Sequence, residues 1–206
     1  MQLLYPLKNI FVTQRYGERP EVYNSFGLSS HNGIDFRAAT GTEIFAAQDG
    51  FVKLVEDQGN KAYGLHIRLQ HAGQGAMSSY ETEYSHLQKA VVSKGQQVKA
   101  GQLIAYSNNS GFSSAAHLHF GLRMTDQNGN PVALANGNKG WIDPQTFLVE
   151  KLSPNPLPLD PWQLNAVTWI QSTQISSGER PLDQITRVEV FELLRKYHEY
   201  LKSQST

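Results

Sequence analysis

Cysteine and excess charge are both missing from this sequence. The absence of cysteine excludes a disulfide framework and any metal site built from thiolates. The 18 Lys and Arg residues balance 18 Asp and Glu residues, so the formal net charge is zero. Because proteins that bind nucleic acid normally present a basic surface to its phosphates, we expect no nucleic-acid partner.

Long apolar segments are missing as well. No uninterrupted apolar run reaches the roughly 18 residues that a membrane-spanning helix needs, so we expect no membrane span. Residues 1–9 lack the basic segment followed by an apolar segment that marks a secretory signal. We therefore expect synthesis in the cytoplasm, with any action outside the cell depending on release by another route.

The first three quarters of the chain predict a mainly β fold. Short segments rich in β-formers alternate with turn residues about every dozen positions, which is typical of an antiparallel sandwich or barrel. Asp49-Gly50 is a strong hairpin signal between two of these segments. The expected strands are residues 43–47, 51–56, 63–70, 79–86, 103–107 and 117–124.

Composition divides the 206 residues into three parts. Residues 1–150 are expected to form one domain. Residues 151–161 hold four of the nine prolines, which predicts an extended linker. Residues 162–206 are expected to form a two-helix appendage, since Thr186-Arg187-Val188-Glu189 is a capping box that opens an amphipathic segment.

The candidate chemistry lies in four histidines and one carboxylate. His117 and His119 stand at i and i+2 of an expected strand, so their side chains share a face about 7 Å apart. His31 and Asp35 would lie about 13 Å apart in an extended chain, too far to share one small ion. Gly33 between them could let the chain bend and bring both inward.

His86, in Tyr84-Ser85-His86-Leu87, completes this set. A catalytic zinc ion usually takes three protein ligands and keeps one position for water. Two of the four histidines would then be free to handle protons, and the residues alone leave open which two.

These motifs occur together in a known family. Residues 24–124 resemble the lysostaphin/LytM-type zinc endopeptidases, which cut peptide bonds in bacterial peptidoglycan. The resemblance is specific because the motifs stand in the family's order and at plausible spacings. They are His31-Asn32-Gly33-Ile34-Asp35-Phe36, Gly41-Thr42, Ala46-Ala47-Gln48-Asp49-Gly50, Tyr63-Gly64, Tyr84-Ser85-His86-Leu87, residues 94–102 and His117-Leu118-His119-Phe120.

The resemblance implies a site and a fold. It implies one zinc ion held by His31, Asp35 and His119, with His86 and His117 as catalytic residues beside the bound water. It also implies a twisted antiparallel sheet with a groove above it. Of the two free histidines we favour His117 as the general base, because its neighbour two residues on would be a ligand; the sequence leaves His86 open for this role.

Two departures from the family pattern leave the cleaved bond open. Gly121 follows Phe120 where the family often has an acidic residue, and the loop at 108–114 differs from the usual pattern.

As groove residues that contact substrate we expect Tyr84, His71 and Asn109.

Other positions have two interpretations. His66 lies on the polar face of its expected strand and is more often a surface or satisfied core histidine than a ligand. Phe112 and Trp141 could contact substrate, although aromatic residues more often fill a core.

The expected function is therefore hydrolysis of peptidoglycan peptides by a zinc-activated water. The absence of a signal segment, together with a small tail, suggests a phage-type lysin or a virion-borne wall hydrolase. Residues 166–194 resemble a fragment of S-layer homology repeats, through Gly178-Glu179-Arg180-Pro181 and the segment at 185–189.

Two other classes of protein compete with this function. A regulator or wall-binding module of the same fold would lack the metal ligands, all of which are present here. A biotinyl or lipoyl carrier domain is suggested by residues 98–104, but it would have no use for the histidines.

Overall fold

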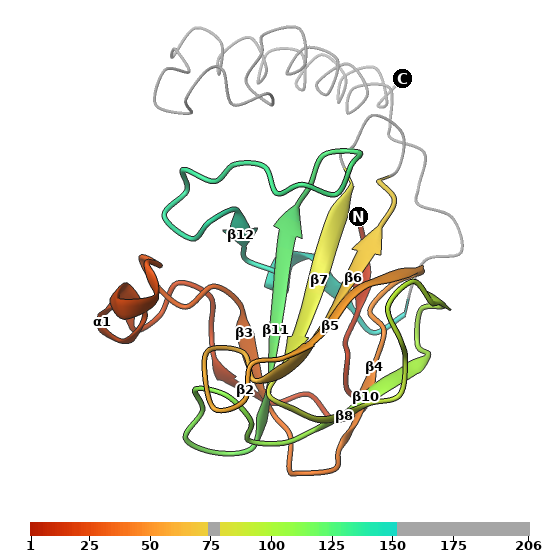
Figure 1. Ribbon diagram of the computed structural model, residues 1–206, viewed down its shortest axis with the longest axis horizontal. Coiled ribbons are helices and arrows are strands. Elements are labelled where there is room, and N and C mark those ends of the chain that lie inside the picture. The colour runs from red at the N-terminus through yellow and green to blue at the C-terminus, as the bar shows by residue number, and fades with distance from the viewer. Residues whose placement is uncertain (74–78, 152–206) are drawn as a thin grey trace, which may run out of the picture. The chain divides into compact units, whose positions relative to one another are not determined.

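The computed structural model describes residues 1–73 and 79–151 (Figure 1). The predicted linker, except its first residue, and the two predicted helices at 162–206 lie outside this range, as does the S-layer-like segment. Among the described residues, no helix is long and apolar enough to cross a membrane.

The described chain is mainly β, as predicted, and one large antiparallel sheet organises it. The order of its strands is β2 (Val12–Gln14), β3 (Ile34–Arg37), β11 (His117–Met124), β7 (Tyr80–Ser85), β6 (Leu65–His71), β5 (Gly50–Asp57) and β9 (Gln97–Val98), with β12 (Trp141–Ile142) also paired to β11. Figure 1 shows the long strands β11, β7, β6 and β5 side by side. Because β11 lies between β3 and β7, distant segments of the chain meet on this strand.

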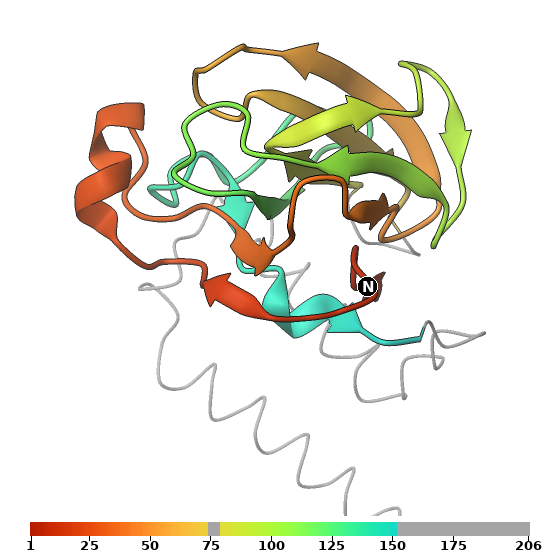
Figure 2. The ribbon, with the colours of Figure 1, turned by 90° about the horizontal axis from the view of Figure 1, so that it is seen from below.

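Two smaller sheets and three short helices complete the described chain. Strands β4 (Glu43–Phe45), β10 (Leu103–Ser107) and β8 (Leu87–Ala90) form an antiparallel sheet, and β1 (Leu3–Leu4) pairs in parallel with β13 (Leu148–Val149). This last pairing places the N-terminus next to the end of the described chain (Figure 2). The helices are α1 (Pro20–Tyr23), η1 (Asn24–Phe26) and η2 (Gln145–Phe147).

The hairpin predicted at Asp49-Gly50 is wrong. Strand β4 pairs with β10, whereas β5 pairs with β6 and β9, so the turn carries the chain from the small sheet to the large one. The Asp49 carboxylate instead accepts hydrogen bonds from Lys99 Nζ at 2.8 Å and from the Ala100 N–H at 2.9 Å. It therefore fastens the turn to the segment after β9.

The two faces of β11 differ in chemistry. Leu118, Phe120 and Leu122 are fully buried and belong to the hydrophobic core. The alternate residues, among them His117 and His119, point to the opposite face. The hydrophobic core thus supports a strand whose other face is free for polar groups.

Candidate metal centre and active-site cleft

Three donor atoms converge on the polar face of the sheet. His119 lies directly opposite Asp35 in the β11–β3 register, so the strand pairing itself brings these side chains together. His119 Nδ1 lies 3.0 Å from Asp35 Oδ1 and 3.0 Å from His31 Nε2, and the third side of the triangle, from His31 Nε2 to Asp35 Oδ1, is 3.1 Å. All three residues are buried.

The tautomer of His31 shows that this triangle fits a cation. His31 Nδ1 lies 2.9 Å from the Arg15 carbonyl oxygen, which can only accept, so Nδ1 carries the proton. In a neutral imidazole, Nε2 then presents a lone pair toward the oxygen of Asp35. Two electron-rich atoms at that distance repel each other unless a cation or proton lies between them. The bond to a backbone carbonyl is also the kind that orients metal-binding histidines.

Gly33 has a different role from the one predicted. It does not adopt a positive φ angle, so the chain does not depend on glycine for a special bend there. A Cβ atom on Gly33 would instead lie 2.6 Å from His119 Cε1 and 2.6 Å from the Phe120 carbonyl oxygen. Glycine is needed because the backbone passes directly against the imidazole of His119.

The structure brings His86 and His117 to the edge of this triangle. Their ring centroids are 4.6 Å apart, and the His86 ring lies 6.1 Å from that of His119. His86 Nδ1 donates to the Ser110 carbonyl at 2.7 Å, and His117 Nδ1 lies 2.8 Å from the Ala115 carbonyl. In both rings, Nε2 is therefore the nitrogen left to act on a ligand.

The charge states of these groups follow from their surroundings. Burial alone would raise the pKa of Asp35, but hydrogen bonds with His119 and His31 outweigh it and hold the pKa well below its usual value. Burial and the neighbouring His119 and His117 lower the pKa of His86 to about 3. At neutral pH, Asp35 is thus a carboxylate and His86 a neutral imidazole.

Asp35, His119, His86 and His117 line a cleft of about 750 Å³. Tyr23 and Tyr63 line it, and the sequence analysis assigned neither of them a role. The Tyr23 ring stacks on His31, with centroids 5.1 Å apart, and the Tyr63 ring lies 5.8 Å from that of His119. The signal for Tyr63 was its place in the Tyr63-Gly64 motif, whereas Tyr23, the last residue of α1, belongs to no motif in the sequence.

None of the three predicted groove residues lines the cleft. Tyr84 and His71 are buried on the other face of the sheet, because they have the strand parity of the core residues. The Tyr84 hydroxyl accepts a hydrogen bond from the Ala47 N–H at 2.8 Å. His71 Nδ1 lies 2.8 Å from the Asp49 carbonyl. Asn109 is exposed on the loop beside the cleft.

The ambiguous aromatic residues do line the cleft, whereas His66 does not. Phe112 is 56% exposed and makes an edge contact with Phe26, with centroids 5.0 Å apart. Trp141 is buried and lies over Gly121, where a Cβ atom would approach its ring to 3.0 Å. His66 is fully buried, with Nδ1 3.1 Å from the Gly64 carbonyl.

The family is decided by a match that contains this site. The model of peptidase family M23 matches residues 29–133, about half of the chain. The chain belongs to peptidase family M23. All three donor residues of the triangle, and both further histidines, fall within the matched range of this M23 chain.

Two curated relatives are similar to the M23 region. One is the peptidoglycan DD-endopeptidase ShyA of Vibrio cholerae, 36% identical over 112 residues, and another is an uncharacterized metalloprotease of Haemophilus influenzae, 38% identical over 107 residues. The matches cover 54% and 52% of this chain but only 24% and 21% of the relatives. The similarity therefore concerns one part of much longer proteins.

A solved structure shows the same fold. The catalytic domain of the antimicrobial peptidase lysostaphin from Staphylococcus simulans superposes with a TM-score of 0.53 at 29% identity. The alignment covers 68% of this chain and 92% of that domain. The M23 chain thus has a lysostaphin-like fold, as the sequence predicted.

Proposed function

We propose that this protein is a zinc-dependent endopeptidase that hydrolyses peptide bonds in bacterial peptidoglycan. The observation that carries the proposal is the buried triangle of His31, Asp35 and His119, of which Asp35 and His119 line a cleft together with two further histidines. The substrate class is supported by the similarity to a peptidoglycan DD-endopeptidase.

The three donors match the set that binds a catalytic zinc ion, two imidazole nitrogens and one carboxylate oxygen. When bound, zinc lowers the pKa of a coordinated water to around 7 and polarises a carbonyl group. Asp35 contributes Oδ1 to the triangle, and its Oδ2 lies 3.5 Å from His117 Nε2. This carboxylate can therefore stabilise a positive charge on His117 as well.

This geometry favours His117 over His86 as the general base. A protonated His117 would be stabilised by Asp35, whereas burial holds His86 neutral, with a pKa of about 3. His86 can accept a hydrogen bond through Nε2 and orient the attacking water, but it is too weak a base to retain a proton. The rigid bond of each Nδ1 to a backbone carbonyl keeps both rings aimed into the cleft.

We also propose that the protein acts at the cell wall as a lysin, either released from the cytoplasm or carried in a virion. The similarity to a peptidoglycan DD-endopeptidase and to the catalytic domain of the antimicrobial peptidase lysostaphin supports action at the wall. Exposure of intact bacteria to the purified protein tests it: loss of turbidity is expected for a lysin, whereas hydrolysis of isolated wall without lysis would contradict it.

A pair of variants tests the enzymatic proposal. His119→Ala should lose both zinc and activity, because it removes a donor atom. His117→Ala should keep zinc and lose at least about 100-fold in turnover, the usual contribution of a general base. Metal content by elemental analysis, and mass spectrometry of new amino termini in digested peptidoglycan, measure the two effects.

Metal removal provides the control. Chelation should abolish cleavage by the wild-type protein, and added zinc should restore it. Intact zinc with no cleavage of any wall preparation would favour a regulator of the same fold. Near-normal turnover by His117→Ala would instead overturn its role as the base.

A further inference from the structure

A second group of side chains lies on the same face of the sheet as the donor triangle. Arg68 on β6 and Arg123 on β11 both line the cleft, and Trp141 lies with them. The two guanidinium groups are 5.5 and 4.5 Å from the centre of the Trp141 ring. This group, which we call the arginine pair with Trp141, has no part in the metal chemistry.

Two fully buried carboxylates form ion pairs with the two arginines. Arg68 Nε donates to Glu83 at 2.5 Å, and Arg123 Nε donates to Glu81. Each guanidinium has five N–H donors, and one carboxylate can accept at most two hydrogen bonds from the same guanidinium. Because each arginine hydrogen-bonds to no second residue in the described chain, donors remain for a ligand on the cleft side.

Gly121 makes room for this arrangement. It lies directly opposite Glu83 in the β11–β7 register, so the acidic group at this level of the sheet comes from β7. A side chain at 121 would collide with Trp141, whose ring comes within 3.0 Å of a Cβ atom built there. Because residue 121 has no side chain, no acidic group from β11 stands between the arginines and the cleft.

The charges around the cleft are strongly unequal. Its lining includes the cations Arg19, Arg68, Arg123 and Lys139, and Asp35 is its single carboxylate among the described residues. Glu81 and Glu83 are fully buried, so they anchor the arginines without facing the ligand, although they offset part of the positive charge. At the surface of the cleft the four cations still outnumber the single carboxylate, which favours an anionic ligand.

The spacing places this wall within a few residues of the metal centre. Arg123 is four residues beyond His119 on β11, about 13 Å along the strand. Arg68 is level with Gly121, about 7 Å beyond His119 in the strand direction, but it lies two strands across the sheet, so the total separation is about 12 Å. An extended peptide covers either distance in about four residues.

We propose that Arg68, Arg123 and Trp141 form a subsite that binds a free carboxylate of the substrate peptide, about four residues from the scissile bond. The proposal rests on the proposed function and names the substrate group that would set specificity there. Guanidinium groups bind carboxylates through paired hydrogen bonds, and Trp141 fixes the planes of both groups by stacking. The carboxylate could belong to a side chain or to the end of the peptide.

Three forms of one peptide distinguish these sources. The synthetic stem tetrapeptide L-Ala–D-Glu–L-Lys–D-Ala would be compared with two forms, one amidated at the glutamate and one at the carboxyl end. Binding to the full-length, zinc-loaded protein would be measured by calorimetry. We expect one of the two amidations to weaken binding at least about tenfold, as for the loss of a charge-assisted pair. Equal affinity for all three forms would overturn the proposal.

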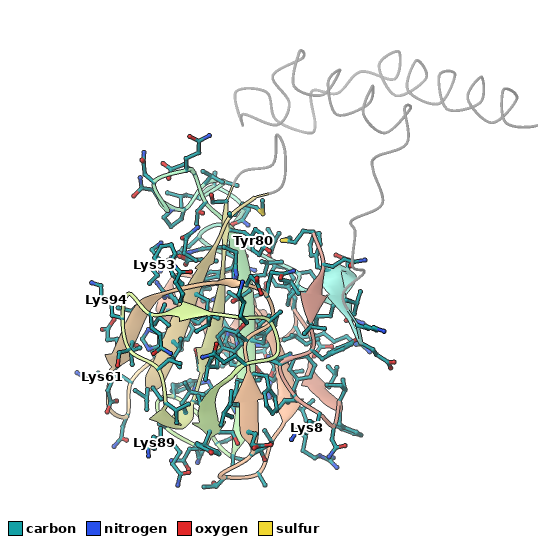
Figure 3. All side chains as sticks on the ribbon, turned by 90° about the vertical axis from the view of Figure 1, so that its right-hand side faces the viewer. Lys8, Lys53, Lys61, Tyr80, Lys89 and Lys94 are labelled. Atoms are coloured by element: carbon teal, nitrogen blue, oxygen red, sulfur yellow. The ribbon has the colours of Figure 1, made fainter. Side chains whose placement is uncertain are left out.

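The double variant Arg68→Gln/Glu83→Gln isolates the subsite. It removes both partners of a buried ion pair, which avoids leaving Glu83 unpaired. It should bind the free acid and the amides equally. The control Lys8→Gln/Glu43→Gln removes an exposed ion pair of 2.6 Å that does not line the cleft, and should keep the discrimination. Lys53 lies close to the subsite, because it donates a hydrogen bond to Glu81, the partner of Arg123. Figure 3 shows that Lys8, the control position, is far from Lys53.

A second variant covers the case in which the double variant does not fold. Arg123→Lys keeps the charge beside Glu81 but loses the planar fork, so it should weaken binding of the free acid about threefold or more and leave the amides unaffected. Unchanged discrimination in this variant would contradict the proposal. Carboxylate discrimination without wall cleavage would refute only the proposed function, whereas cleavage without discrimination would refute only the subsite.

Discussion

At the scale of single residues, surroundings decide what each histidine does. Burial lowers the pKa of His71 to about 4. Burial and the neighbouring His119 and His117 lower the pKa of His86 to about 3. His86 opens on the cleft and has a left-handed φ of 63°, an uncommon conformation for a residue other than glycine. His71 contacts the Thr82 hydroxyl at 2.8 Å inside the core. His86 is therefore placed to act on a bound substrate, whereas His71 contributes to packing of the core.

The buried His71 predicts a pH dependence of stability. Its folded pKa of about 4 lies below the ordinary histidine pKa of 6.5, so between these pH values the unfolded chain binds a proton that the folded chain does not. The free energy of unfolding should therefore fall as the pH falls through this window, by at most about 3 kcal/mol from this group. Urea unfolding of metal-free protein at pH 7.5 and pH 5 measures the effect.

The variant His71→Gln provides the comparison. It should be less stable than the wild type at pH 7.5, because it loses packing and hydrogen bonds. Its stability should depend less on pH, because it cannot take up this proton. An equal loss of stability in both proteins between the two pH values would contradict the assignment.

At the scale of elements, close backbone contact between two loops positions His86. Gly64 and Gly111 have φ angles of 60° and 79°, and a Cβ atom on Gly64 would lie 2.5 Å from Gly111 N. The adjacent Ser110 provides the carbonyl that holds His86 Nδ1 and a hydroxyl that accepts from the Leu65 N–H at 3.1 Å. The loop after β10 is therefore fastened to β6 at the same point at which it orients the histidine.

Gly64→Ala should separate these loops. We expect it to destabilise the protein by about 1 to 3 kcal/mol more than the control Gly59→Ala, because inserting an atom into packed structure has roughly that cost. Gly59 has nearly the same φ, 62°, but nothing within 4 Å of a Cβ atom, so the control carries the backbone cost alone. Turnover should fall in the first variant only.

Urea unfolding and kinetic measurements on both variants check this prediction. Equal destabilisation by the two substitutions would show that the loop contact is unimportant. Normal turnover by a destabilised Gly64→Ala variant would separate the contact from the orientation of His86.

At the scale of the whole described chain, its first and last strands pair with each other. Leu3 pairs with Leu148 in the parallel β1–β13 ladder, and both side chains are buried. The described residues, up to residue 151, belong to one compact unit. The end of this unit is therefore part of its hydrophobic core, which places a sharp limit on where the chain can be shortened.

Two truncations test this limit. A chain ending at residue 151 keeps β13, whereas a chain ending at residue 147 loses the buried Leu148 and exposes Leu3. The shorter chain should melt about 5 to 15 °C below the longer one, from the apolar area and hydrogen bonds lost. Melting followed by circular dichroism measures the difference, and matching transitions would contradict it.

Much of the fold was accessible from local patterns. The alternation around Ile67 and Leu69 predicted β6, and the i, i+2 spacing placed His117 and His119 on one face of a strand. These predictions succeeded because strand formation and side-chain alternation depend on near neighbours. The hairpin at Asp49 failed because a turn signal does not reveal which distant strand each arm will pair with.

The sequence by itself determined the mainly β class, the lysostaphin-like fold and the donor types at residues 31, 35 and 119. Only the tertiary structure decided that His71 and Tyr84 face the core, and that Arg68 meets Trp141. The physical reason is that period-two alternation divides a strand into two faces without saying which face the core will cover. That choice follows from pairing between β3, β11, β7 and β6, whose residues lie far apart along the chain.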